Sequence, residues 1–193
     1  MPSRRARLAH RWNHHRPAGY LFTGAEHGQA QPFIDAHMLR RSDRLFEVLE
    51  AGSLLPSAPA GVVALAGSPS ILWVGRLIEG KQPLLAIEAF RQYAATRPEA
   101  HLHLLATDRT LEAEVRAAIA ALGPVGEQVH VHDPVPHAAM AGWYSAADVY
   151  LSTSRSEGSN YSLIEAMTLG CAPAVSDIPS HCAIVGDLAE PFA

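Results

Sequence analysis

Short apolar runs alternate with segments of helical periodicity from residue 71 to residue 176, and this alternation constrains the fold more than any other feature. Each run has the length of one strand, and each intervening segment has the length of one helix. Strands that alternate with helices need crossover connections, which are right-handed and give a parallel sheet with helices on both faces. The sequence therefore predicts an α/β fold with a doubly wound parallel sheet. The expected strands are 71–74, 101–105, 128–132, 149–152 and 172–176, and the expected helices are 83–96, 110–122, 136–146 and 161–169.

Changes in composition divide the chain into four segments. The first combines Arg, His and Pro without apolar periodicity and is expected to be a disordered or loosely packed basic tail. The second has a strand-like run at each end of a helical pattern over 29–39 and is expected to form one βαβ unit. The third is rich in Gly, Pro and Ser, as linkers are, and the fourth carries the alternating pattern. These segments are residues 1–19, 20–53, 54–70 and 71–193.

The charge distribution argues against a nucleic-acid partner. The net charge is −4, and the first sixteen residues hold five arginines and no acid, so the remainder carries −4 less these five, or −9. A nucleic-acid binder shows the opposite balance. No apolar run approaches the roughly 20 residues of a transmembrane helix, and no apolar stretch of signal-peptide type follows the basic opening. We therefore expect a cytoplasmic protein without a transmembrane segment.

The loop after the strand 71–74 carries two cations close to a helix start. Gly75 and Arg76 follow the strand, and Lys81, the only lysine of the chain, lies two residues before Pro83. Proline suits the first turn of a helix, and the free N–H groups and dipole of a helix N-terminus favour an anion. The loop therefore predicts a diphosphate site, and the alternative is two exposed cations on a turn.

A second polar loop follows the strand 149–152. Glu157 is expected in this loop, Gly158 and Asn160 permit turns that face backbone amides toward a ligand, and Glu165 is expected one turn inside the next helix. Two carboxylates eight residues apart on one helix would point about 80° apart, so they converge on one ligand only if Glu157 lies off the helix. The alternative is a loop charge and a helix-surface charge, which twelve glutamates make unsurprising.

Four separated motifs lie in these strands, loops and helices. They are Gly75-Arg76-Leu77 with Lys81, Ala147 to Ser152, Glu157-Gly158 to Glu165-Ala166-Met167, and Gly170 to Val175. Their order and spacing, over roughly residues 70 to 190, resemble the donor-binding half of the retaining glycosyltransferases of family 4, which have the GT-B fold. The resemblance implies the Rossmann-like donor domain of an enzyme that uses a nucleotide sugar.

The resemblance also implies roles for individual residues. Arg76 and Lys81 would hold the donor diphosphate and stabilise the charge that develops on it as it leaves. Glu157 would hydrogen-bond the transferred sugar and balance positive charge at its anomeric carbon, so Glu157, Arg76 and Lys81 are the catalytic candidates. Glu165 would bind the ribose hydroxyls. The implied donor-binding set is Gly75, Arg76, Lys81, Glu157, Gly158, Asn160, Tyr161, Ser162, Leu163 and Glu165.

The same resemblance implies that no metal and no cofactor are needed, because cationic side chains and a helix dipole take their place. The backbone amides of Ser162 and Leu163 would assist the two cations. The donor substrate would be a UDP-, GDP- or ADP-sugar, and the base, the sugar and the acceptor stay open. The chain has Gly158-Ser159-Asn160-Tyr161 where the family often has Gly-Phe-Gly after the first glutamate.

The segment from Phe22 to Ser53 resembles the last strand-helix-strand of the family's acceptor-side domain, running into the interdomain linker. A GT-B enzyme closes its active site between two domains. We therefore expect a fragment that lacks the N-terminal acceptor domain and is truncated at its C-terminus. The bare interdomain face would leave an apolar patch that favours self-association.

Two other functions stay open. A sugar-nucleotide epimerase of the same fold would need acid and base groups around the hexose. A catalytically silent module that binds a nucleotide sugar is the other alternative, and the missing acceptor half favours it for the isolated chain.

Histidines at alternate positions raise the question of a metal site. His101 and His103 share one face of an expected strand, and His130 and His132 share one face of another. No carboxylate or cysteine pattern completes a set of ligands. Partly buried polar residues are therefore expected here, and no metal.

Overall fold

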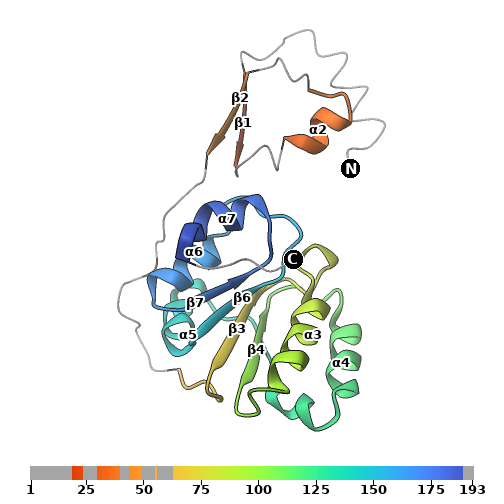
Figure 1. Ribbon diagram of the computed structural model, residues 1–193, viewed down its shortest axis with the longest axis vertical. Coiled ribbons are helices and arrows are strands. Elements are labelled where there is room, and N and C mark those ends of the chain that lie inside the picture. The colour runs from red at the N-terminus through yellow and green to blue at the C-terminus, as the bar shows by residue number, and fades with distance from the viewer. Residues whose placement is uncertain (1–18, 24–29, 40–43, 49–54, 56–62, 189–193) are drawn as a thin grey trace.

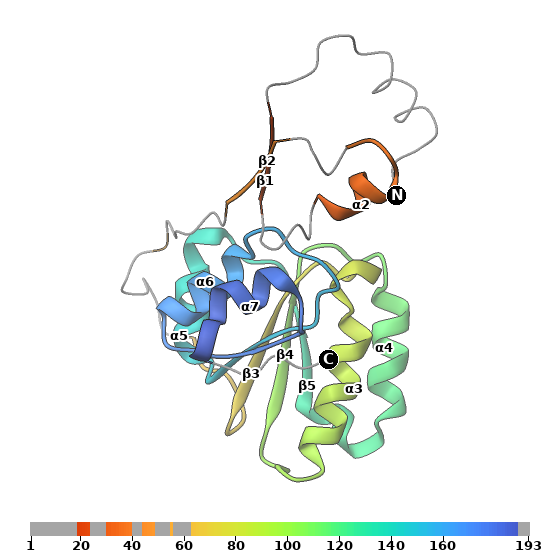
Figure 2. The same cartoon turned by 45° about the horizontal axis from the view of Figure 1, so that its top comes forward.

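The computed structural model describes residues 19–23, 30–39, 44–48, 55 and 63–188 (Figure 1). The expected basic tail, apart from Gly19, lies outside the described residues, and so does much of the expected linker. Helices cover both faces of a central sheet. A small unit formed by β1 (Tyr20–Thr23), α2 (Gln31–Asp35) and β2 (Leu45–Val48) lies above α6 (Tyr161–Thr168) and α7 (Pro179–Val185) in Figures 1 and 2.

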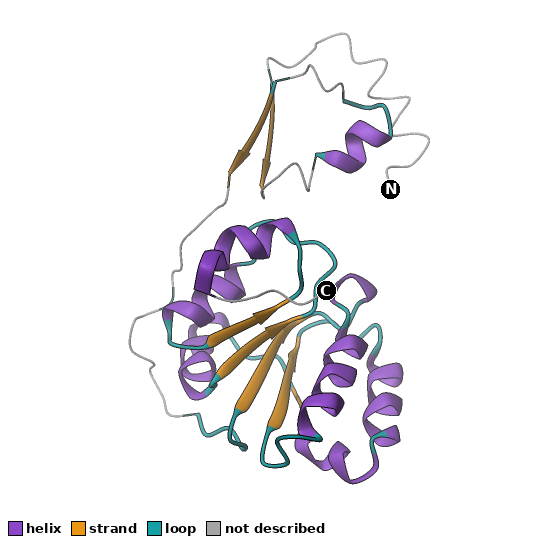
Figure 3. Ribbon diagram, viewed as in Figure 1, coloured by secondary structure: helices purple, strands orange, loops and turns teal. Residues whose placement is uncertain are grey.

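Five strands form the central sheet, and every pair of neighbours is parallel. The order is β5-β4-β3-β6-β7 (Figure 3). The strands are β3 (Ser70–Gly75), β4 (His101–Ala106), β5 (Val129–His132), β6 (Val149–Ser152) and β7 (Ala172–Val175). The chain winds outward from β3 to β5 and then returns to start β6 on the other side of β3. The predicted doubly wound parallel sheet is confirmed, and its switch point lies between β3 and β6.

The helices divide between the two faces of the sheet. One pair lies side by side on one face, and three helices cover the other (Figure 2). The pair is α3 (Pro83–Ala94) and α4 (Glu112–Ala121), and the three are α5 (Met140–Ala146), α6 (Tyr161–Thr168) and α7 (Pro179–Val185). Single 3-10 turns are η1 (Glu79–Lys81), η2 (Gly123–Gln128), η3 (His137–Ala139) and η4 (Gly186–Leu188). The predicted helices all exist, and α7, with seven residues, was not predicted.

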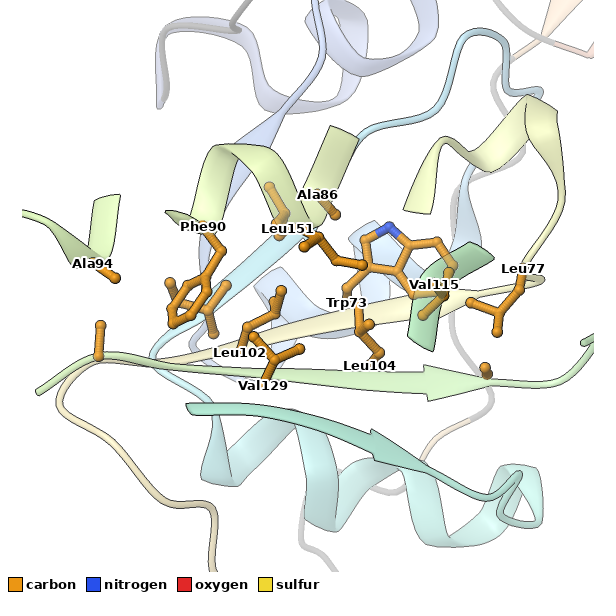
Figure 4. Close-up of a cluster of buried hydrophobic side chains, with 14 residues drawn as sticks. Trp73, Leu77, Ala86, Phe90, Ala94, Leu102, Leu104, Val115, Val129 and Leu151 are labelled. Atoms are coloured by element: carbon orange, nitrogen blue, oxygen red, sulfur yellow. The ribbon is translucent and has the colours of Figure 1, made fainter. Parts of the chain in front are cut away.

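The side of the sheet that meets α3 and α4 carries the larger apolar cluster (Figure 4). Trp73 of β3 and Phe90 of α3 are each 2% exposed in this cluster, which also includes Leu104 of β4 and Val115 of α4. Burial of each such side chain contributes about 1.5–3 kcal/mol. The opposite side is filled by Leu72, Tyr144, Tyr150, Leu163 and Val175, among others. Neighbouring buried residues along one strand therefore point into opposite cores, as Leu72 and Trp73 of β3 do.

The small unit is a strand-helix-strand, as expected from the sequence. It consists of β1 (Tyr20–Thr23), α2 (Gln31–Asp35) and β2 (Leu45–Val48), and its two strands pair in parallel from Tyr20 opposite Leu45. Leu21, Phe46 and Val48 are exposed on these strands. Among the described residues, no helix has the length and apolar character needed to cross a membrane.

Candidate functional site

The loops after β3 and β6 meet at the carboxyl-terminal edge of the sheet, beside the switch point. Thr153, which is completely buried, joins them. Its Oγ1 shares its one proton between the carbonyl oxygens of Lys81 and Gln82, both at 3.0 Å, and accepts a hydrogen bond of 3.2 Å from Nε1 of Trp73. The backbone N–H of Arg155 adds a bond of 3.0 Å to the carbonyl of Gly80. Because neighbouring parallel strands end at the same edge, residues 72 positions apart are brought into contact.

Lys81 and Glu157 form an ion pair across this junction. Nζ of Lys81 donates to Oε1 of Glu157, and Oγ of Ser154 donates to the same oxygen at 2.6 Å. The two charged side chains are 23% and 11% exposed, so solvent screens their attraction only in part. Glu157 lies in the loop and not on α6, as convergence on one ligand requires.

Gly75 and Arg76 lie at the end of β3, on the same edge. The Arg76 side chain is exposed beside the next loop. There, hydrogen bonds from Thr110 lower the pKa of Asp108, and the positive charge of Arg76 adds a smaller effect in the same direction. The structure thus pairs Lys81 with Glu157, whereas the exposed Arg76 lies next to Asp108 and outside this pair.

The N-terminus of α6 follows the Glu157 loop. Asn160 adopts the left-handed conformation with φ 35°, which asparagine tolerates better than most residues. Its Oδ1 accepts a hydrogen bond of 3.3 Å from the N–H of Leu163, so it caps the helix. Tyr161 is 48% exposed, Ser162 is half-buried and Leu163 is fully buried. The cap satisfies the Leu163 N–H and so fixes the first turn of α6.

Gly158 contributes room and not a positive φ. Asn160 has a positive φ, whereas Gly158 does not. A Cβ added at Gly158 would lie 2.9 Å from Oγ1 of Thr23, at the end of β1. A larger residue would therefore push apart the small unit and the Glu157 loop.

Glu165 meets a different partner from Glu157. It is 5% exposed, and its Oε1 accepts a hydrogen bond of 2.9 Å from Nε2 of His137, at the start of η3. Burial, with a smaller effect of the Glu165 charge, raises the pKa of neighbouring Tyr144. The two carboxylates therefore have different partners, Lys81 and His137. His137 was not among the predicted site residues, and its only sequence signal is that it follows the end of a strand.

The four alternating histidines form a separate cluster on β4 and β5. Nδ1 of His101 lies 2.8 Å from Nε2 of His130, and Nδ1 of His103 lies 3.0 Å from Nε2 of His132. The rings stack, with centroids 4.8 Å apart for His103 and His130. Within the described residues, no group of three or more His, Cys, Asp or Glu side chains is arranged to hold a metal ion.

A family model described as "Glycosyl transferases group 1" matches residues 68–190. No curated protein sequence matches the chain. The matched residues include the whole central sheet and both loops of the candidate site.

Solved structures with a similar fold cover most of the chain. The GtfA/B complex superposes with a TM-score of 0.66 at 19% identity, over 89% of this chain and 34% of that one. The pneumococcal O-GlcNAc transferase GtfA, in complex with UDP and GlcNAc, gives 0.60 at 16% identity, over 84% and 30%. A UDP-forming α,α-trehalose-phosphate synthase from Burkholderia xenovorans, in complex with glucose-6-phosphate, gives 0.55 at 13% identity, over 62% and 31%. These likenesses show a Rossmann-like GT-B fold, and the chain spans about a third of each of these proteins.

Proposed function

The chain belongs to the glycosyl transferases group 1 family, and on this premise we propose that it binds a nucleotide-diphosphate sugar for retaining transfer to an acceptor. The observation that carries the proposal is the Lys81–Glu157 pair beside the capped N-terminus of α6. A cation, a carboxylate and helix amides at one edge match the needs of a diphosphate joined to a sugar.

Lys81 would donate from Nζ to the diphosphate, and the exposed side chain of Arg76 would bind the same group. Both charges would stabilise the negative charge that grows on the diphosphate as the sugar leaves. The Ser162 amide at the start of α6 would add a donor, since the Leu163 N–H is already bound by the Asn160 cap. No metal is required in this arrangement, because fixed cations supply the charge.

Glu157 would accept a hydrogen bond from a sugar hydroxyl and balance positive charge at the anomeric carbon. Ser154 holds the carboxylate in place for this task. Glu165 would accept hydrogen bonds from the ribose, in exchange for or together with its bond to His137. UDP is the first nucleotide to test, because the GtfA structure named above contains it and the synthase is named as UDP-forming.

The acceptor would be bound by a second domain, as in the two-domain architecture of GT-B enzymes. The exposed Leu21, Phe46 and Val48 of β1 and β2 favour this, because apolar strand residues need a cover. A second candidate function is a silent module that binds the donor without transferring it.

Calorimetric titration of UDP, GDP and ADP into the wild-type chain and Lys81→Met tests the proposal. A charge-assisted hydrogen bond contributes about 1.5–3 kcal/mol, so the affinity for the preferred nucleotide should fall roughly 10- to 150-fold. The matched control is Arg155→Met, which removes a cation from an exposed pair with Glu79 in the same loops and should change affinity less than about twofold.

Equal affinity in the wild type and Lys81→Met, or no binding of any of the three nucleotides, contradicts the proposal. Donor hydrolysis separates the two candidate functions. Release of sugar from the corresponding nucleotide sugar by the purified chain would exclude the silent module.

A further inference from the structure

We propose that His181 is a positioning residue for the donor site, because it fixes the Asn160 side chain at the start of α6 and supports the loop that carries Glu157. The inference rests on the proposed function, since the helix start and the loop that it supports carry the Ser162 amide and Glu157, which are assigned to the phosphate and the sugar. His181 lies in α7, the helix that the sequence pattern did not indicate.

His181 is completely buried, yet both of its ring nitrogens have partners. Nδ1 lies 3.0 Å from the carbonyl oxygen of Ser176, and Nε2 lies 2.8 Å from Nδ2 of Asn160. An imidazole buried without partners costs free energy. These two contacts therefore explain how a polar ring is tolerated beneath the site.

The chemistry of the partners fixes the tautomer. A carbonyl oxygen only accepts, so Nδ1 of His181 carries the proton and Nε2 has a lone pair. That lone pair accepts from the Asn160 amide nitrogen, which turns Oδ1 of Asn160 toward the N–H of Leu163. His181 thus selects the one orientation of the Asn160 carboxamide in which it caps α6.

A second chain of contacts runs from His181 to the ion pair. The hydroxyl of Ser176, 3.3 Å from Nδ1 of His181, donates to the carbonyl of Ser154 at 2.6 Å. The Ser154 hydroxyl in turn donates to Oε1 of Glu157, the oxygen that Lys81 also binds. One buried ring therefore connects the helix terminus and the carboxylate.

Two substitutions separate the two hydrogen-bonding functions of the ring, the acceptor at Nε2 and the donor at Nδ1. His181→Gln can present an oxygen near the position of Nε2 and so keep the acceptor for Asn160. His181→Asn can present an N–H near the position of Nδ1 and so keep the donor to Ser176, while the acceptor for Asn160 is lost. Each variant loses one buried hydrogen bond, so a purely structural residue would give the two the same affinity.

The first measurement is the affinity for the nucleoside diphosphate that the wild type binds most tightly among UDP, GDP and ADP. His181→Gln should stay within about threefold of the wild type. His181→Asn should bind about five- to tenfold more weakly, the effect of losing a helix cap. In an Asn160→Gly background, which keeps the left-handed backbone but has no cap, His181→Asn should have no further effect. Equal losses for both His181 variants, or additive losses in the double variant, overturn the inference.

The second measurement needs no ligand. Amide hydrogen exchange at Leu163 should be about tenfold faster in His181→Asn than in the wild type and close to wild type in His181→Gln, with α3 and α4 unchanged. Unchanged exchange at Leu163 in His181→Asn overturns the inference whether or not a nucleotide binds. The expected exchange pattern in a chain that binds none of the three nucleotides would support the positioning role of His181 and contradict the proposed function.

Discussion

The same sheet gathers two clusters of titratable side chains, one of like groups and one of opposite charges. On β4 and β5, four histidines stack and bond ring to ring, and Nε2 of His103 donates to the carbonyl of Ala66 at 2.9 Å. At the ends of β3 and β6, Lys81 and Glu157 bind each other across two loops. We call these the histidine cluster and the charged cluster.

The difference lies in what each cluster can do with charge. Neighbouring imidazoles satisfy one another only while most are neutral, since a positive charge on one disfavours a charge on the next. In the charged cluster, Lys81 and Glu157 can each give up the other as a partner and bind a group of a ligand instead. It also lies on loops at the carboxyl edge, whereas the histidines lie on the strands themselves. The number of titratable residues in a cluster therefore does not make it a candidate site. What matters is whether the cluster holds opposite charges and whether it lies on the loops at the carboxyl edge of the sheet.

The largest expected change in stability comes from a substitution that disrupts the charged cluster without removing a charge. Thr153→Val deletes the hydroxyl that joins Trp73 to the carbonyls of Lys81 and Gln82. Buried groups without partners cost about 1–3 kcal/mol each, so the free energy of unfolding should fall by about 3 kcal/mol in urea denaturation.

Thr153→Ser is the control, because it keeps the hydroxyl and should cost less than half as much. If the valine and serine variants were equally stable, the hydroxyl would not be what holds the two loops together.

The second effect concerns the histidine cluster and acid. A histidine in an unfolded chain titrates near pH 6.5, whereas burial, with a smaller contribution from the neighbouring histidines, lowers the pKa of His103 to about 4. Between these values the unfolded chain binds a proton that the folded chain does not, so stability falls as the pH falls. At roughly 1.4 kcal/mol per pKa unit, about 2 kcal/mol should be lost between pH 7 and pH 5.

Urea denaturation of the wild type and His103→Gln at both pH values measures this loss. Glutamine can still donate to the carbonyl of Ala66 but does not titrate, so the variant should lose less stability on acidification. A variant with the same pH dependence as the wild type would mean that His103 does not carry the effect.

The smallest expected effect comes from a second ion pair in the same loops as the charged cluster. Arg155 and Glu79 are 60% and 83% exposed, with 3.0 Å between Nη1 and Oε1. Surface pairs of this kind contribute about 0–1 kcal/mol, so Arg155→Ala should change the free energy of unfolding by less than about 1 kcal/mol. A larger loss would show that exposure is a poor guide to which pair of these loops matters.

Much of the fold was accessible from the sequence because it depends on local periodicity. Two kinds of repeated pattern can be recognised along the chain without knowledge of its folding. They are the apolar runs that form β3 to β7 and the helical spacing of Ile87, Phe90 and Ala94 in α3. Lys81 and Glu157 were each expected on a loop that follows a strand, and the family resemblance assigned both to one donor. Their role toward a donor is still a proposal.

The sequence by itself determined the alternation of strands and helices, the edge at which their loops collect, and the family, because each follows from spacing along the chain. Only the tertiary structure decided that Thr153 ties the two loops, that Glu165 meets His137 and that His181 orients Asn160. These contacts join residues on different elements, and a hydrogen bond depends on a distance of about 3 Å that no one-dimensional pattern encodes. The same reason explains the histidine cluster: strand register placed the rings together, and burial lowers the pKa of His103, His130 and His132.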